Sequence, residues 1–219
     1  MSYGLLTTVH IVASSFEIAS LAYITKPLLM LFLALFFYRN APKPLTQLSK
    51  VTLYALFFSW LGDVLLMFQN HQAIYFMLGL VSFLIAHLCY IFAFTKTPKP
   101  SKGSIKIVAA ASFVYLLVGM GSINFLKDGL GDMLIPVIVY SLTIIGMNVM
   151  AVSRYKKVSN SSFWWVMIGA ISFLISDSLI AVNKFYTPIP APSFWIMSTY
   201  CLGQFLIVIG ILKQFIYAE

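Results

Sequence analysis

Two carboxylates stand inside long apolar stretches of this chain, and they are the side chains best placed for acid–base chemistry. Asp63 lies in FFSWLGDVLLMF (residues 57–68), and Asp177 lies in GAISFLISDSLIAVNKF (residues 169–185). A carboxylate at the centre of a membrane helix costs about 2.5–3.5 kcal/mol on insertion scales, and such residues usually face a bundle interior or a wet cavity. Each aspartate alone could be a structural group satisfied by Ser, Asn or Lys neighbours. Two of them in matching motifs, GDVLL and SDSLI, favour a functional pair.

The elements that carry these aspartates have the composition of membrane spans. Of the 219 residues, 61% are hydrophobic and only 9% are charged. Soluble domains are about half apolar and about a quarter charged. We therefore expect an all-α membrane protein, a bundle of eight transmembrane helices in a single integral membrane domain over residues 1–219. The expected spans are 4–20, 22–38, 50–68, 72–94, 104–123, 131–153, 161–183 and 193–216.

Basic residues alternate between the expected loops, and this predicts the orientation. Eleven of the 14 Lys and Arg residues fall on one side: Arg39, Lys43, Lys50, Lys96, Lys99, Lys102, Lys106, Arg154, Lys156, Lys157 and Lys213. The opposite side holds Lys26, Lys127 and Lys184. Because basic loops stay in the cytoplasm, we expect both termini there. The same rule accounts for the net charge of +8 without a nucleic-acid partner.

This orientation places Asp63 and Asp177 at similar depth in the outer half of the membrane. Each lies on the third helix of a four-helix half, so a distant 4+4 duplication is an open alternative to chance similarity. A metal site has no support, because the three His residues lack a metal-binding pattern and the two Cys residues, Cys89 and Cys201, fall inside apolar runs where packing is the usual role.

Further polar residues cluster on the expected outer side. Glu17 and Lys26 flank the first turn, and Asn183 and Lys184 follow Asp177. Each lysine either extends to the membrane interface or binds an anionic head group.

Three more polar residues share helix faces with their neighbours. Tyr200 and Gln204 are spaced i, i+4, which suits either hydrogen bonding between helices or pocket lining. Ser59, one turn before Asp63, could bond the aspartate or its own helix backbone.

Five motifs in order, YITKPLLM, LGDVLLM, GLVSFLIAHLCYI, ISDSLIAVNKF and TYCLGQFLIVIG, make the chain resemble the YhhN-like lysoplasmalogenase family of multipass membrane proteins. The resemblance covers nearly the whole chain. It implies an eight-helix enzyme that cleaves the vinyl ether bond of lysoplasmalogens, giving a fatty aldehyde and glycerophosphoethanolamine or glycerophosphocholine. The family's motif aspartates fall on Asp63 and Asp177, its Lys-Pro motif on Lys26 and Pro27, and its Asn-Lys pair on Asn183 and Lys184.

The chemistry that the resemblance implies suits two carboxylates. Vinyl ether hydrolysis needs a general acid, an anion near an oxocarbenium ion and a base that positions water, as in glycosidases. We expect Asp63 and Asp177 to form this pair across the bundle, with Lys26 or Lys184 holding the phosphate. We expect no metal or organic cofactor, a lysophospholipid substrate drawn from the bilayer, and a place in a bacterial inner membrane or an equivalent membrane. The sequence leaves open which aspartate is the acid and what the oligomeric state is.

The main alternative is a proton- or cation-coupled transporter of lipids or small molecules, because intramembrane carboxylates also suit carriers. Against it, the spans carry no paired Gly/Pro interruptions of the kind that mark broken-helix binding sites. A lipid-binding scaffold without catalysis is a third hypothesis, and it predicts lysolipid binding that does not depend on either aspartate's charge.

Overall fold

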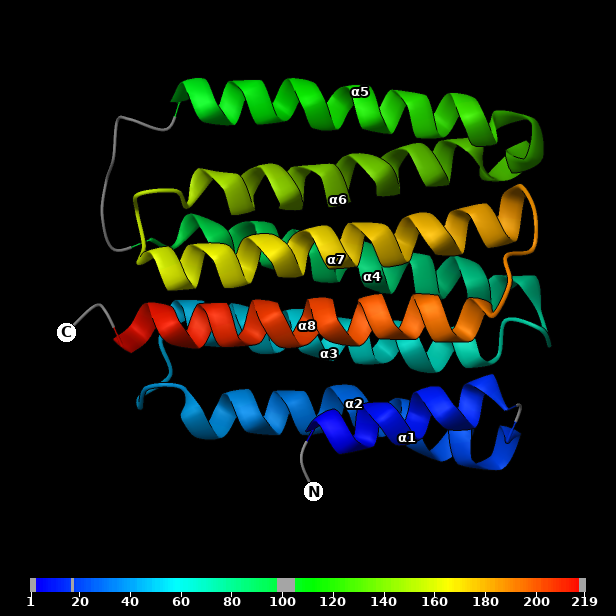
Figure 1. Cartoon of the computed structure of the whole chain (residues 1–219), viewed down its shortest axis with the longest axis horizontal. Coiled ribbons are helices and arrows are strands. Elements are labelled where there is room, and N and C mark those ends of the chain that lie inside the picture. Colours follow the sequence, from blue (N-terminus) through cyan, green and yellow to red (C-terminus); the bar gives the residue numbers. More distant parts are fainter. Residues whose placement is uncertain (1–2, 17, 98–104, 217–219) are drawn as a thin grey trace. The chain divides into compact units, whose positions relative to one another are not determined.

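The fold is all-helical across residues 3–16, 18–97 and 105–216, the part of the chain that the computed structural model describes (Figure 1). The helices follow one another with short connections, as expected for antiparallel neighbours. They are α1 (Tyr3–Ser15), α2 (Ala19–Asn40), α3 (Gln47–Met67), α4 (Ala73–Thr95), α5 (Ile105–Leu130), the 3₁₀ turn η2 (Gly131–Met133), α6 (Leu134–Ser153), α7 (Asn160–Phe185) and α8 (Pro192–Ile216).

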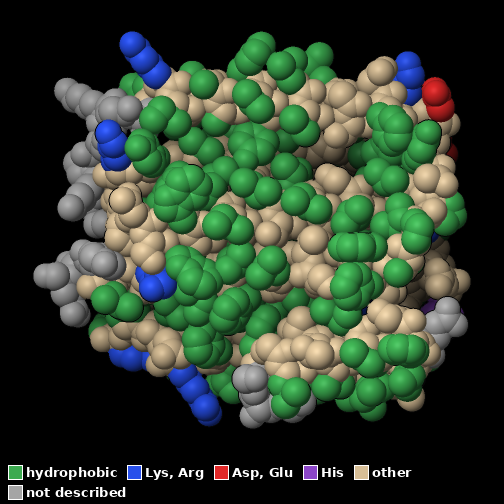
Figure 2. Space-filling view, in the orientation of Figure 1, with side chains coloured by type: hydrophobic (Ala, Val, Ile, Leu, Met, Phe, Trp, Pro, Cys, Tyr) green, Lys and Arg blue, Asp and Glu red, His purple; other side chains and the backbone are tan. Residues whose placement is uncertain are grey.

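The apolar length of these helices makes the chain an integral multipass membrane protein. By length and composition, six segments of the described chain could cross a membrane, and one of them, Ile105–Ser153, contains both α5 and α6. Large apolar side chains such as Phe113, Leu117 and Met120 on α5 are exposed, as lipid contact requires. Figure 2 shows hydrophobic side chains spread over the visible face, whereas Lys and Arg lie toward its margins.

The expected first span, 4–20, is wrong, and so is the count of eight spans. Helix α1 has 13 residues and ends at Ser15, and α2 begins at Ala19. A helix of that length is about 20 Å long, shorter than the roughly 30 Å of a bilayer's hydrocarbon. Because an α1 that does not cross removes one crossing, the basis for placing the N-terminus in the cytoplasm is lost as well.

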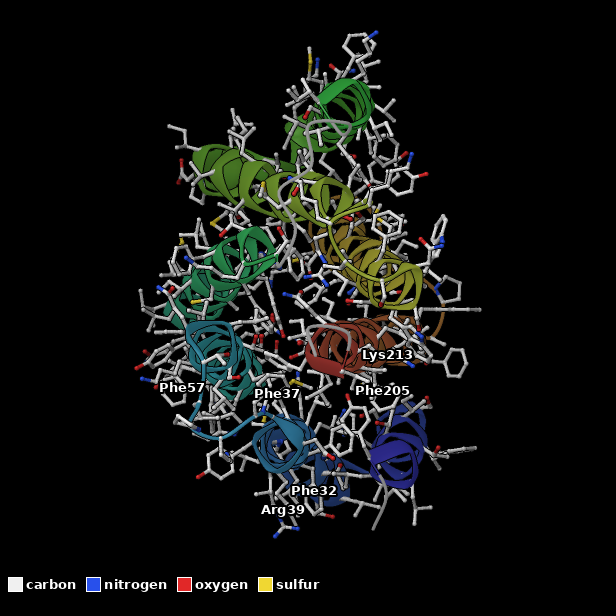
Figure 3. All side chains as sticks on the ribbon, turned by 90° about the vertical axis from the view of Figure 1, so that its left-hand side faces the viewer. Phe32, Phe37, Arg39, Phe57, Phe205 and Lys213 are labelled. Carbon is white, nitrogen blue, oxygen red and sulfur yellow. The ribbon has the colours of Figure 1, made fainter. Side chains whose placement is uncertain are left out.

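The chain divides into two compact units, Met1–Ala93 and Phe94–Glu219. In the first, α1 packs on α2 and α2 packs on α3. Figure 3 shows how α2 divides its side chains: Phe37 is fully buried, whereas Arg39 lies on an exposed position two residues later. The division falls near the middle of the expected 4+4 arrangement, although a repeat of the sequence remains a prediction.

Within the first unit, α3 and α4 come into close contact beside Asp63. A Cβ atom on Gly62 would lie 2.6 Å from the ring of Phe83, and one on Gly79 would lie 2.7 Å from Leu66 Cδ2. Distances this short leave no room for a side chain, so the two glycines let the helices touch, as small residues do in membrane bundles. The aspartate that follows Gly62 is therefore held on a tightly packed part of α3.

The second unit is built on an antiparallel pair, α7 and α8, which lie side by side in Figure 1. We call their line of contact the α7–α8 seam. It pairs three residues of α7 with three of α8, each seven residues apart along its helix: Ser162 with Gly210, Gly169 with Gly203, and Ser176 with Ile196.

Each pairing in the α7–α8 seam has its own contact. Ser162 Oγ donates to the Gly210 carbonyl at 2.6 Å, and Ser176 Oγ donates to the Ile196 carbonyl at 3.1 Å. Between them, a Cβ atom on Gly169 would lie 2.8 Å from the Gly203 carbonyl oxygen. A repeat of seven keeps these small residues on one helix face, and close backbone contact with side-chain hydrogen bonds is how membrane helices associate.

Candidate functional site

Asp63 is buried inside the first unit, with only 3% of its surface exposed. Ser59, one helical turn earlier, is fully buried on the same face of α3. The two side chains therefore share an interior-facing side of the helix, and the hydrogen bond expected of Ser59 remains a prediction. A carboxylate in such a place is costly unless its environment supports it, which is why intramembrane acids are functional candidates.

The other candidate residues of the first unit lie on α2 or outside the described part. Lys26 is half-buried next to Pro27, and it is close enough to His10 of α1 for the two to interact electrostatically. His10 in turn holds Thr25 through a 2.9 Å contact between Nδ1 and Oγ1. Glu17, which the sequence placed in the same group, lies outside the described residues.

Asp177 lies in the second unit, where α6 supplies a partner that the sequence did not predict. Tyr140 donates its phenolic proton to Asp177 Oδ2 at an O···O distance of 2.5 Å. Ser176 beside it donates a hydrogen bond to the Ile196 carbonyl of α8, and this bond fixes the rotation of α7 at this point. The carboxylate is half-buried and oriented by both neighbouring helices.

One feature of the sequence could have indicated the role of Tyr140. Tyr and Trp residues in membrane proteins favour the interfaces, but Tyr140 falls near the middle of the expected span 131–153. A polar ring at that depth needs a partner for its hydroxyl group. The identity of the partner could not be read, because it comes from a helix 37 residues away in the sequence.

Asn183 and Lys184 occupy the end of α7, and their surroundings differ from those expected of a ligand pair. Asn183 Oδ1 accepts a hydrogen bond from the Ile189 backbone N–H at 3.1 Å, which ties the helix end to the following loop. Lys184 is exposed in the last turn, where a cation complements the negative end of the helix dipole. Asn183 thus has a structural contact, and Lys184 lies at an exposed position.

Tyr200 and Gln204 share a buried face of α8, as their spacing predicts. Tyr200 is 4% exposed and meets the ring of Phe173 edge-on, with centroids 5.5 Å apart, and Gln204 is fully buried. The Tyr200 ring packs against α7 close to the α7–α8 seam. This ring contact gives Tyr200 a packing role between α7 and α8, whereas the hydrogen-bonding and pocket-lining roles that the sequence left open remain predictions.

The predicted site residues thus fall into two groups. Asp63, Ser59 and Lys26 belong to the first unit, and Asp177, Asn183, Lys184, Tyr200 and Gln204 belong to the second. The pairing of the two aspartates on one substrate remains a prediction. Among the described residues, no cluster of three or more His, Cys, Asp or Glu side chains could hold a metal ion.

Comparison with known proteins gives one family and several named relatives. A family model described as the YhhN family matches residues 21–211, a range that contains Asp63, Tyr140 and Asp177. The chain is 30% identical over 163 residues to the lysoplasmalogenase TMEM86A of Homo sapiens, covering 73% of this chain and 64% of that protein. It is 29% identical over 160 residues to the human lysoplasmalogenase TMEM86B, covering 73% and 62%.

A bacterial relative shows the same level of similarity. The lysoplasmalogenase of Mycobacterium tuberculosis is 30% identical over 141 residues, covering 62% of this chain and 50% of that protein. The matches therefore span less than two thirds of the length of each of these relatives. No solved structure matches the chain significantly.

Proposed function

Because the chain belongs to the YhhN family, we propose that it is a membrane hydrolase that cleaves the vinyl ether bond of lysoplasmalogens. The products would be a fatty aldehyde and glycerophosphoethanolamine or glycerophosphocholine. The observation that carries the proposal is the intramembrane carboxylate Asp177 held by the Tyr140 hydroxyl, inside the segment that matches the family. An oriented carboxylate of this kind is typical of acid–base chemistry rather than of packing.

The reaction adds one water molecule to the substrate and breaks one C–O bond. A general acid gives a proton to the β carbon of the vinyl ether, which leaves an oxocarbenium ion. Water adds to that cation and loses a proton to a base, and the resulting hemiacetal collapses to the aldehyde and the free glycerol hydroxyl. A carboxylate near the cation stabilises it, as in glycosidases.

The surroundings of the two aspartates support a division of these roles. Asp177 accepts a hydrogen bond from Tyr140 at Oδ2, so it is suited to remain the anion that stabilises the cation and accepts the proton of water. Asp63, the other carboxylate of the proposed pair, is almost fully buried and so shielded from water. We assign Asp63 as the acid and Asp177 as the base.

The loop charges and two lysines indicate how the substrate would lie in the membrane. The loop charges favour a cytoplasmic location for the ends of α2, α4, α6 and α8. On the opposite side, Lys26 and Lys184 could each hold a phosphate, while the aliphatic chain stays among the apolar helices. The substrate would then enter from the bilayer of a bacterial inner membrane or an equivalent membrane.

Aldehyde release from the purified protein in detergent tests the proposal. Lysoplasmenylethanolamine is the substrate, and the matched control is the 1-O-alkyl analogue, which has the same chain and head group but no vinyl double bond. We expect aldehyde from the first and none from the second. A well-folded protein that releases no aldehyde would contradict the proposal, and uptake into sealed vesicles would then test the carrier alternative.

The Tyr140→Phe variant tests whether the phenol orients the base. Removing a hydrogen bond to a charged group costs about 1.5–3 kcal/mol, which corresponds to roughly 10- to 100-fold in rate. We expect kcat to fall by that factor while KM stays within about twofold, because Tyr140 is a positioning residue that contacts Asp177 and not the substrate.

Tyr155→Phe is the control for the Tyr140 variant. It removes a phenolic hydroxyl from the same unit just beyond the far end of α6, where the Tyr155 ring packs on Phe163. We expect this variant to keep the wild-type kcat. Equal activity of the Tyr140 variant and wild type would remove Tyr140 from the mechanism.

A further inference from the structure

Arg154 is a buried cation with unused hydrogen-bonding capacity. It follows the last residue of α6 and is fully buried. Its Nη2 donates to Ser162 Oγ at 2.8 Å. Within the part of the chain that the structure describes, its Nε and Nη1 have no hydrogen-bond partner. A buried guanidinium with open donors is expensive, because arginine does not shed its charge at neutral pH.

No carboxylate that the structure describes in the same unit compensates this charge. Asp132 precedes α6 and Arg154 follows it, so the 20 residues of α6, about 30 Å, separate them. Asp128 lies in the last turn of α5, next to Asp132, and Asp177 is fifteen residues beyond Ser162 on α7, about 22 Å along the axis. These are the described carboxylates of the unit.

Two helix ends of opposite sign meet at the guanidinium, because Arg154 is the C-cap of α6, whose C-terminus carries about half a negative charge, and it also contacts the start of α7. Ser162 lies in the first turn of α7, a 26-residue helix capped by Ser159, whose Oγ accepts the Ser162 backbone N–H at 3.1 Å. The N-terminus of a helix carries about half a positive charge. The Phe94 ring, 5.4 Å from the guanidinium carbon, gives partial cation–π compensation but no hydrogen-bond acceptor for Nε or Nη1. Burial lowers the pKa of Arg154 to about 9, which still leaves it a cation at pH 7.

The hydrogen bonds also fix the direction of the guanidinium. Ser162 Oγ gives its proton to the Gly210 carbonyl and accepts from Arg154 Nη2, so this hydroxyl ties α6, α7 and α8 together. Nη2 carries two N–H bonds and Ser162 accepts one of them, so the edge on its other side, which Nη2 shares with Nε or with Nη1, is open. Two adjacent N–H donors on one edge match two oxygens of a phosphate group.

We infer that Arg154 and the first turn of α7 form a binding site for a phosphate group, supplied either by a phospholipid head group or by free inorganic phosphate. The site differs from the one proposed for substrate, because Lys184 stands 22 residues beyond Ser162, about 33 Å along α7. Since Arg154 is fully buried, a phosphate reaches it only when the packing around the guanidinium opens. Binding therefore adds to the contacts that join α6, α7 and α8, and it stabilises the unit.

Thermal unfolding of the full-length protein in detergent measures this binding. One titration uses inorganic phosphate against sodium chloride of equal ionic strength. The other uses dioctanoyl phosphatidic acid against dioctanoylglycerol, which has the same chains without the phosphate. We expect a saturable rise of Tm in the wild type, because a ligand that binds only the folded state stabilises it.

Two variants locate the site. In Arg154→Gln the half-saturating concentration should rise at least tenfold. Lys156→Gln removes one positive charge from the connection between α6 and α7 at an exposed position, and it should stay within about twofold of wild type. If Arg154→Gln does not fold, Arg154→Lys keeps the charge but loses the planar fork, and it should also bind at least tenfold more weakly.

The titrations test the proposal and distinguish the two possible sources of the phosphate. Saturation with inorganic phosphate indicates a site for the free anion, and saturation with phosphatidic acid alone indicates a head-group site. No saturable rise in wild type with either probe overturns the proposal, whatever the variants do. An unchanged response in the folded Arg154 variant also overturns it. Neither result depends on aldehyde release, so this inference and the proposed function are tested independently.

Discussion

Asp177→Asn lowers aldehyde release by about a thousandfold or more, and this is the largest effect on activity that we expect. Asparagine has the shape of aspartate, and its side-chain oxygen can still accept the hydrogen bond from Tyr140. The amide cannot carry a negative charge or accept the proton of water. General acid–base catalysis contributes about 10²- to 10⁴-fold, and the stabilisation of the cation is lost with it. The measurement is kcat in detergent.

Asp63→Asn should have a comparable effect, because an amide cannot supply the proton that starts the reaction. The double variant distinguishes a joint role from two separate ones. Residues that act in one step are strongly non-additive, so the double variant should be little worse than either single variant. Independent roles would instead multiply the two losses.

Asp128→Asn is the control for both aspartate variants. Asp128 is exposed in the last turn of α5, so the substitution removes the same charge where no role in the reaction is expected. It should keep full activity. Full turnover by a folded Asp63→Asn or Asp177→Asn variant would show that the paired-carboxylate mechanism is wrong.

The positions of the helices could be predicted from apolar runs, but some of their ends could not. The span expected at 104–123 belongs to α5, which continues to Leu130. Lys127 and Asp128 end the apolar run, yet both residues fit a helix that extends into the head-group region. The helix stops before Gly131, whose φ of +48° lies in the left-handed region that glycine adopts easily.

The burial of the candidate residues was also predictable, whereas their partners were not. Helical periodicity places Ser59 with Asp63 and Tyr200 with Gln204, because residues four apart share a face. Tyr140 contacts Asp177 through the packing of α6 on α7, and no spacing within one helix encodes that contact. The failure of the first span has a related cause, since hydropathy measures the apolar character of α1 but not where its helix breaks.

The α7–α8 seam could be predicted from the sequence only in part. The spacing of seven between Ser162, Gly169 and Ser176 and between Gly203 and Gly210 is visible in the sequence. What the sequence does not state is the antiparallel register that sets Gly169 opposite Gly203. That register follows from the hydrogen bonds at both ends of the seam.

Gly203→Leu prevents the second unit from folding, and this is the largest effect on stability that we expect. A Cβ atom at Gly203 would lie 2.9 Å from the Gly169 carbonyl oxygen and 3.0 Å from the Phe173 backbone nitrogen. Both obstacles are backbone atoms, so only a separation of the two helices could make room. Size-exclusion profiles and Tm in detergent are the measurements, and we expect aggregation or no cooperative transition.

Two further variants calibrate the Gly203 result. Gly203→Ala adds only the Cβ atom, and since overpacking costs about 1–3 kcal/mol, Tm should fall by roughly 2–12 °C for a chain of this size. Gly121→Leu makes the same change as Gly203→Leu on α5, where a Cβ atom would meet nothing within 4 Å, and it should fold like wild type.

Separation of α7 from α8 would also break the Ser176 hydrogen bond beside Asp177. The Ala variant should therefore lose activity at temperatures below its Tm, and wild-type activity and stability in Gly203→Leu would show that this register is wrong.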